Sequence, residues 1–289
     1  MNITASWTVQ IGSGKAACED HALILPLNPK EEPQIINGHT GSIALTSPAL
    51  IAVADGVGGN PGGHEASCFV MNRLSEVLKT KVSVANEQKL KDIVNSINQE
   101  LIKYASELAT TSLNGDATTQ EANQVSNLGK ERMATTLVAA LIDAQQVLAV
   151  NVGNSRLYAL NGCFMKQLTH DHTTYQLLLD QGRPEDAEHC NKCEITSCLG
   201  GGKAGLAAWL QVYKVATADR MPKTLILTSD GVHEFISEDK FEELMSMPDI
   251  TDEHRAQLIA QEARNNGSED DISIVIIRLT APTGKPVGF

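Results

Sequence analysis

The sequence predicts a single α+β domain built from antiparallel sheets. Three observations support this class: many short apolar runs of strand length, hairpin turns between several of them, and helical patterns that come in two pairs. No linker-like stretch divides the chain. A single domain is therefore expected over residues 1–280, followed by a frayed tail at 281–289.

The first half of the chain is expected to contain three strands and then two amphipathic helices. The strands are expected at 3–10, 22–27 and 43–54, and the helices at 64–80 and 87–109. Residues 28–42 hold prolines and glycines and are interpreted as an exposed loop. Residues 110–130 are rich in Thr, Asn and Gln, which predicts a mobile loop.

The second half begins with strands and ends with a helix pair and a last strand. Strands are expected at 133–142, 147–152, 156–160, 206–217, 223–229 and 272–279. Helices are expected at 172–181, 238–246 and 252–265, the first of them ended by Gly182 with Pro184 just beyond. No regular element is evident at 183–204.

Composition narrows the classes of function. The chain has 289 residues and a net charge of −12, which disfavours nucleic-acid binding and anionic membrane surfaces. No apolar run approaches the roughly 18 residues that a membrane span requires. The six cysteines do not suggest a disulfide framework. A soluble, cytoplasmic protein with reduced thiols is expected.

The segment around Asp55 is the first candidate site. An apolar run from Ala49 to Ala54 ends on this carboxylate, and a glycine-rich loop begins at Gly56. Glycine lets a backbone approach a ligand closely, and carboxylate and carbonyl oxygens suit Mg²⁺ or Mn²⁺. The alternative is that Asp55 only starts a turn.

Other acids follow the same pattern. Asp230 ends a strand, Asp270 directly precedes one, and Glu19 and Asp20 precede another. Such acids can converge on one rim of a sheet pair. Because like charges repel, the cluster would need cations to neutralise it, and two divalent ions bridged by one carboxylate is the usual solution. The alternative is that each acid separately caps a helix.

Seven short blocks occur in fixed order along the chain: Glu19-Asp20, Asp55-Gly56-Val57-Gly58-Gly59, Val152-Gly153-Asn154-Ser155-Arg156, Leu168-Thr169-His170-Asp171-His172, Ile195-Thr196-Ser197-Cys198-Leu199-Gly200, Ser229-Asp230-Gly231 and Gly267-Ser268-Glu269-Asp270-Asp271-Ile272-Ser273. Together they resemble one family, the metal-dependent serine/threonine protein phosphatases of the type 2C class, and most closely its compact bacterial members. The resemblance spans about residues 8–279 and implies a four-layer α-β-β-α sandwich, with two antiparallel sheets flanked by helix pairs.

The resemblance also implies roles for the acids. Asp55 would bridge two Mn²⁺ or Mg²⁺ ions, Asp230 and Asp270 would hold the first ion, and Glu19 with the Gly56 carbonyl would serve the second. Asp20 would orient a metal-bound water. Metal activation of water suits phosphoryl transfer without a covalent intermediate.

The implied activity is hydrolysis of phosphoserine and phosphothreonine on proteins, which would oppose a serine/threonine kinase in signalling. The alternative is a non-catalytic relative of the same fold that binds phosphoproteins and regulates them.

The sequence departs from the family pattern in four places. Lys15 stands where the family has its phosphate-binding Arg, and a solvated Lys is the alternative interpretation. Asn154 replaces the Asp of the third metal site, which argues against a third ion; the alternative is that Asn154 only ends a strand and hydrogen-bonds the turn before Arg156. Val57 replaces a histidine of some animal members, and Ser197-Cys198 replaces a usual Arg.

Cysteines near the active-site block form a further pattern. His189, Cys190 and Cys193, with Cys198 close by, resemble a small zinc-ligand set. An accidental cluster is the alternative. Two nucleotide-binding motifs fail on spacing, since Ala16 and Pro61 stand where a P-loop and a dinucleotide fingerprint need other residues.

Overall fold

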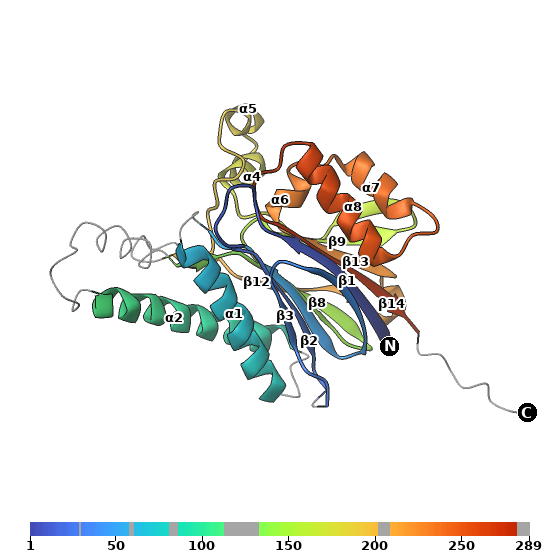
Figure 1. The fold of residues 1–289 in the computed structure, drawn as a ribbon, viewed down its shortest axis with the longest axis horizontal. Helices are drawn as coiled ribbons and strands as arrows, with labels where there is room; N and C mark the ends of the chain where they lie inside the picture. Colours follow the sequence, from blue (N-terminus) through green and yellow to red (C-terminus); the bar gives the residue numbers. More distant parts are fainter. Residues whose placement is uncertain (29, 58–60, 81–85, 113–132, 202–208, 282–289) are drawn as a thin grey trace, which may run out of the picture.

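Two antiparallel sheets packed face to face form the centre of the molecule (Figure 1). The computed structural model describes residues 1–28, 30–57, 61–80, 86–112, 133–201 and 209–281. Within these ranges the first sheet has the order β10-β9-β13-β14-β1-β4 and the second the order β12-β8-β7-β5-β2-β3, with a two-stranded β11-β6 pair beside them. Every named strand pair is antiparallel. This confirms the expected sheets.

The strands lie close to the predicted positions. The first sheet contains β1 Asn2–Gln10, β4 Thr40–Thr46, β9 Arg156–Asn161, β10 Phe164–Gln167, β13 Thr224–Thr228 and β14 Ile272–Thr280. The second contains β2 His21–Pro26, β3 Gln34–Ile36, β5 Ala49–Ala54, β7 Leu137–Ile142, β8 Gln146–Val152 and β12 Gln211–Thr217. The small pair is β6 Ala134–Thr135 with β11 Leu199–Gly200.

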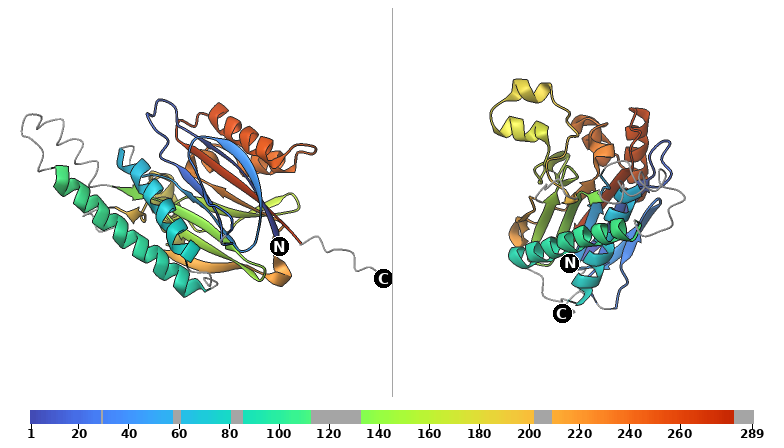
Figure 2. Two further views of the ribbon diagram at one scale, coloured as in Figure 1. Left: turned by 60° about the horizontal axis from the view of Figure 1, so that its bottom comes forward. Right: turned by 90° about the vertical axis from the view of Figure 1, so that its left-hand side faces the viewer.

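Helix pairs cover the two outer faces. α1 Pro61–Thr80 and α2 Glu87–Ser112 lie on the second sheet. α7 Glu238–Ser246 and α8 Asp252–Asn265, with the short α6 Asp230–His233, lie on the first. Figures 1 and 2 show the resulting layers. The four-layer α-β-β-α sandwich is therefore confirmed.

Strand β5 shows how the layers are held together. Leu50 and Ala52 pack under α1 and α2, whereas Ile51 and Val53 pack between the sheets. All four are fully buried, because successive side chains of a strand point to opposite faces. A strand buried on both faces is apolar throughout, so its first polar residue, Asp55, marks the point where the chain leaves the core.

The region between β2 and β5 differs from the prediction in two ways. Residues 28–42 are not only a loop: they include β3, a short edge strand paired with β2, and the start of β4. The strand expected at 43–54 is two strands in different sheets, divided at the cis Ser47–Pro48 bond. Pro48 has no backbone N–H and cannot continue a strand ladder. The prediction of one strand ran across this break.

Residues 173–196 form a projection that we call the flap (Figure 2, right). It contains α4 Thr174–Asp180, whose N-cap Thr173 accepts a hydrogen bond from the Gln176 amide, and α5 Pro184–Glu188. The prediction that 183–204 holds no regular element is therefore wrong for α5 and β11, which are too short to show a period. β10 was also missed. The expectations for most of 110–130, for 206–208 and for 282–289 lie outside the described residues.

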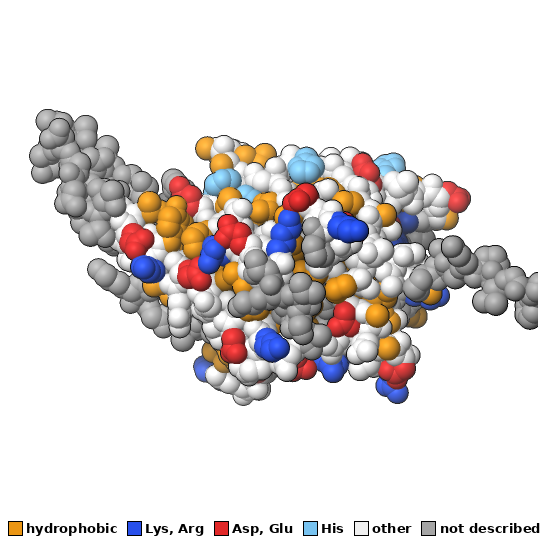
Figure 3. All heavy atoms as spheres, turned by 90° about the horizontal axis from the view of Figure 1, so that it is seen from below, with side chains coloured by type: hydrophobic (Ala, Val, Ile, Leu, Met, Phe, Trp, Pro, Cys, Tyr) orange, Lys and Arg blue, Asp and Glu red, His pale blue; other side chains and the backbone are white. Residues whose placement is uncertain are grey.

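The surface carries both signs of charge. On the described part of the face seen from below, acidic and basic side chains are interspersed rather than gathered by sign (Figure 3). Among the described helices, none combines the length and the apolar character needed to cross a bilayer.

Asp252 joins α8 to the first sheet and provides a test of the packing. Its carboxylate accepts hydrogen bonds from Arg278 at 2.6 and 2.7 Å and from Arg255 at 3.2 Å. Burial acts to raise the pKa of Asp252, but the bonds and charges of both arginines outweigh it and lower this pKa. The ionised carboxylate therefore stabilises the fold above its unfolded pKa of about 3.9.

We expect Asp252→Asn to lower the free energy of unfolding at pH 7 by about 1–3 kcal/mol, the usual loss for a charge-assisted pair. The difference from wild type should begin to shrink as the pH falls below about 4, where the unfolded state takes up the proton, and should disappear below the lowered pKa of the folded state, where Asp252 is protonated in both states. Urea titrations at several pH values measure this. Glu253→Gln, on the exposed neighbour in α8, is the matched control. An equal loss at pH 3 and pH 7 would contradict the assignment.

Candidate metal centre

The registers of the two sheets bring the acids to one end of the sandwich. In the second sheet His21 pairs with Ala54, so the adjoining residues Asp20 and Asp55 leave neighbouring strands at the same end. In the first sheet the Ser229 amide donates to the Ser273 carbonyl at 3.0 Å, which brings Asp230 close to the start of β14. Acids from four strand ends thus share one rim, as predicted.

Asp20 lies deepest in this cluster. It is fully buried, and neither carboxylate oxygen has a hydrogen-bond partner among the described residues. Burial, followed by the charge of Asp271, raises the pKa of Asp20 to about 8; the hydroxyls of Ser273 and Ser229 act in the opposite direction. A buried, unpaired carboxylate is unfavourable unless a cation or proton neutralises it.

The pKa values of Asp55 and Asp230 are raised in the same way. Burial raises the pKa of Asp55 well above its ordinary value, and the charges of Asp20, Asp230 and Asp270 add to the effect. Burial also raises the pKa of Asp230, with Asp270 next in importance. Repulsion among these carboxylates therefore favours bound positive charge at this rim.

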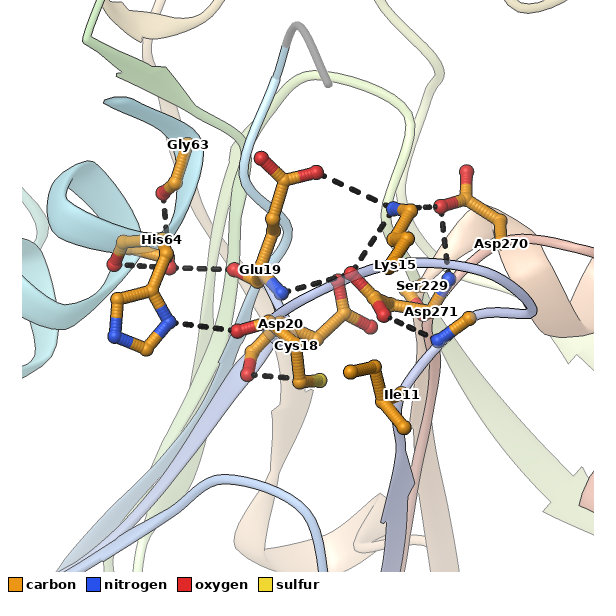
Figure 4. Close-up of polar contacts among 12 residues, drawn as sticks. Ile11, Lys15, Cys18, Glu19, Asp20, Gly63, His64, Ser229, Asp270 and Asp271 are labelled. Atoms are coloured by element: carbon orange, nitrogen blue, oxygen red, sulfur yellow. Dashed lines mark hydrogen bonds and ion pairs between the residues drawn. The ribbon is translucent and has the colours of Figure 1, made fainter. Parts of the chain in front are cut away.

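Lys15 supplies positive charge there. Its ammonium lies 2.5 Å from Asp270 Oδ1, 3.0 Å from Asp271 Oδ2 and 3.3 Å from Glu19 Oε2 (Figure 4). Burial acts to lower the pKa of Lys15, but the bonds to Asp270 and Asp271 raise it above the ordinary value. Lys15 is therefore placed at the acid cluster, in contact with two predicted ligands.

Asp271 is the site residue that the sequence analysis missed. Its Oδ1 accepts from the Gly12 amide at 2.6 Å, and its Oδ2 accepts from the Glu19 amide at 2.8 Å (Figure 4). These bonds fasten the loop that carries Lys15 and Glu19 to the start of β14. The carboxylate directly after Asp270 was the available signal, but sequence alone does not show which member of the pair turns inward.

Two glycines approach each other to make room for Glu19. A Cβ on Gly56 would lie 2.5 Å from the Gly63 backbone, and a Cβ on Gly63 would lie 2.6 Å from Glu19 Oε1. The Glu19 carbonyl accepts bonds from the Gly56 amide at 3.2 Å and from Ser67 Oγ at 2.5 Å. Gly56 and Gly63 are thus required by close packing. Residues 58–60 lie outside the described ranges.

Asn154 is turned toward a predicted ligand. Its Nδ2 donates to Asp230 Oδ2 at 2.9 Å, and its side chain is 1% exposed. Neither Asn154 Oδ1 nor Asp230 Oδ1 has a partner in the described part of the chain. The side chain therefore contacts the main acid cluster directly.

The donor set fits a divalent metal, although it is not yet closed around one point. In the described residues no three His, Cys, Asp or Glu side chains converge as a ready-made ligand group. The unpartnered oxygens of Asp20 and Asp230, the like charges beside them and the all-oxygen chemistry are nevertheless those that Mg²⁺ and Mn²⁺ require.

The zinc-like cysteines are not brought together. Cys190 Sγ donates to the Ala187 carbonyl, Cys193 Sγ donates to Glu234 Oε2, and Cys198 is buried. With no ligand group among the described residues, the structure gives no support to a zinc site. The accidental interpretation remains.

Comparison with known proteins agrees with this geometry. The family model described as Protein phosphatase 2C matches residues 39–261, more than half of the chain. "Serine/threonine phosphatase stp" of Listeria innocua is 30% identical over 236 residues, which are 79% of this chain and 83% of the relative. "Serine/threonine protein phosphatase PstP" of Mycobacterium tuberculosis is 25% identical over 88% of this chain and 45% of its own length.

Solved structures share the fold. Stp1 from Staphylococcus aureus superposes with a TM-score of 0.72 at 23% identity, covering 96% of this chain and 95% of that chain. The catalytic domain of PstP in complex with two manganese ions superposes with a TM-score of 0.66 at 22% identity, covering 97% and 100%.

Fold, site and relatives define the class of protein: the chain is a protein phosphatase, and hence an enzyme. More particularly, it belongs to the protein phosphatase 2C family. The resemblance found in the sequence motifs is therefore confirmed.

Asp271→Asn tests the fastening of the loop. An amide cannot accept with two charged oxygens, so we expect the Gly12 and Glu19 amides to exchange hydrogen for deuterium at least tenfold faster, corresponding to about 1.4 kcal/mol of local stability. Native-state exchange measures this. Glu269→Gln changes an exposed neighbour and should leave both amides protected. Unchanged protection in Asp271→Asn would refute this role.

Proposed function

We propose that this protein phosphatase hydrolyses phosphoserine and phosphothreonine on proteins, using a water activated by two divalent metal ions. One observation carries the proposal: carboxylates from four strand ends share one rim, where Asp20 is fully buried and both its oxygens and Asp230 Oδ1 lack partners among the described residues. The serine/threonine phosphatases to which the chain is similar support the substrate class.

The acids divide into two groups by position. We assign Asp230 and Asp270, from the first sheet, to one ion, and Glu19 with the Gly56 carbonyl, from the second sheet's end, to the other. Asp55 lies between the groups, as the influence of both Asp20 and Asp230 on its pKa indicates, and would bridge them. The ions would acidify a bound water and neutralise phosphoryl oxygens. Mn²⁺ and Mg²⁺ both suit these ligands.

Asp20 and Lys15 have different tasks. The free oxygens of Asp20 lie beneath the rim, where they can accept a hydrogen bond from a water and orient it. Lys15 reaches the same rim from the loop above, and its ammonium can pair with a substrate phosphate. A lysine provides a point charge rather than the two-pronged contact of an arginine, so weaker phosphate binding is expected.

Asn154 supports a two-ion rather than a three-ion site. It carries no charge, and its amide is already bonded to Asp230. We propose that it holds this carboxylate in place and that a third ion is not bound there.

The proposed partner is a phosphorylated protein, with a serine/threonine kinase as the opposing enzyme in signalling. Action in the cytoplasm is part of the proposal, supported by the six cysteines, all of which are free thiols. The alternative, a non-catalytic phosphoprotein-binding relative, lacks a supporting observation, because no predicted metal acid is missing.

Removal of metal provides the direct activity test. Chelation should abolish hydrolysis of a chromogenic phosphate ester, and Mn²⁺ or Mg²⁺ should restore it. Asp270→Asn should lower kcat by at least a hundredfold and weaken Mn²⁺ binding measured by calorimetry, since a charged ligand is lost. Asp239→Asn, on an exposed residue of α7, is the control. Full activity of chelated enzyme or of Asp270→Asn would exclude the two-metal proposal.

The role of Lys15 in phosphate binding is tested by measuring separately how its substitution changes kcat and KM. If its ammonium binds the phosphate before and during transfer, Lys15→Ala should raise KM by roughly one to two decades and change kcat little. Lys15→Arg should retain binding. Steady-state kinetics with a phosphothreonine peptide measures both constants. An unchanged KM would show that Lys15 only offsets the charge of the acids.

A further inference from the structure

A cavity of about 230 Å³ lies beside the metal centre, between the flap and α6. Arg156 and Asp171 line one side, Tyr175 and Lys192 of the flap line another, and Glu234 follows directly after α6. None of these residues belongs to the predicted metal ligands. The cavity is therefore a separate feature of the active-site end.

The positive groups of the cavity already have partners. The Arg156 guanidinium donates to Asp171 at 2.6, 3.0 and 3.1 Å and to the Tyr158 hydroxyl at 3.3 Å. The Lys192 ammonium lies 5.0 Å from the centre of the Tyr175 ring, within the range of a cation–π contact. An incoming anion would have to compete with these interactions.

Hydrogen-bond acceptors, by contrast, remain available. Glu234 is exposed, and only its Oε2 has a hydrogen bond among the described residues, from the Cys193 thiol at 3.0 Å. His233 also lines the cavity, but its Nε2 is buried and has no partner in the described part of the chain. Glu234 is therefore the acceptor that an incoming side chain can reach.

The cavity lies within reach of a peptide whose phosphate occupies the metal centre. The Glu234 amide donates to the Asp230 carbonyl at 3.1 Å, so Glu234 follows Asp230 by one helical turn, about 5.4 Å. An extended peptide advances about 3.3 Å per residue. The side chain that reaches the cavity therefore belongs to a residue close to the phosphorylated one, within one to three positions on either side.

We propose that this cavity is a substrate subsite that binds an Arg or Lys side chain close to the phosphorylated residue, with Glu234 as its main partner. The N–H groups of such a side chain can donate hydrogen bonds to the open acceptors. Its positive charge is opposite to that of the exposed Glu234 carboxylate. The inference rests on the proposed function and adds a sequence preference to it.

A panel of short phosphothreonine peptides tests the subsite. The peptides differ only in carrying Arg, Ala or Glu at one, two or three positions on either side of the phosphothreonine. For each, kcat/KM and the dissociation constant are measured with the metal-loaded enzyme. We compare wild type with Glu234→Gln and Glu234→Lys. Glu185→Gln, an exposed acid of α5 in the same flap, is the matched control.

Wild type should prefer Arg over Ala at one of these positions by about tenfold, the effect of a charge-assisted contact. This ratio should fall toward one in Glu234→Gln, invert to favour Glu in Glu234→Lys, and persist in Glu185→Gln. If Glu234 has only a structural role, its substitution would lower kcat/KM for all peptides alike. The Arg-to-Ala ratio would then stay unchanged, and the proposal would be overturned. A wild-type preference for Glu would also overturn it, and would instead implicate Lys192.

The dissociation constants and the kcat/KM values together distinguish a failure of the subsite from a failure of the proposed reaction. If the Arg preference appears in the dissociation constants while no peptide is hydrolysed, the subsite is supported and the proposed reaction is contradicted. If peptides are hydrolysed with equal kcat/KM for Arg and Ala, the reaction stands and the subsite does not.

Discussion

Repulsion among buried carboxylates is the constraint on which this end of the molecule depends. Asp20, Asp55 and Asp230 lie at the ends of strands that are themselves buried on both faces, and each has a raised pKa because of burial and like charge. A cluster of this kind is unfavourable for folding, so it persists only where cations offset it. The sandwich supplies rigid strand ends, and the ligands gain their precision from that rigidity.

The surrounding structure is organised to carry this charge. Both oxygens of Asp271 accept hydrogen bonds from the Gly12 and Glu19 amides. This carboxylate therefore holds in place the loop that carries the Glu19 carboxylate. Lys15 comes with the same loop and places a positive charge among the acids. Asn154 contacts Asp230 without adding charge. Each neighbour thus positions or neutralises an acid, and none competes as a nucleophile.

Much of this arrangement could be predicted from sequence because strand ends are visible as abrupt changes from apolar residues to Asp. That signal located Asp55, Asp230 and Asp270 correctly at one rim. It failed where pairing is decided at long range: the prediction of one strand over residues 43–54 runs across Pro48, where the chain changes sheet, and the edge strand β3 is too short to recognise. Asp271 was missed because the choice of inward-facing carboxylate in an Asp-Asp pair depends on the partner loop, which is distant in sequence.

The central claim is that the acid rim holds two divalent ions. Anomalous diffraction at the manganese edge from crystals soaked in Mn²⁺ tests it most directly. The account predicts two peaks between the sheets' ends, one at Asp230 and Asp270 and one at Glu19 and the Gly56 carbonyl, with Asp55 touching both and Lys15 displaced from Asp270. A map without peaks at this rim, with the Lys15 ammonium still bonded to Asp270, would contradict it.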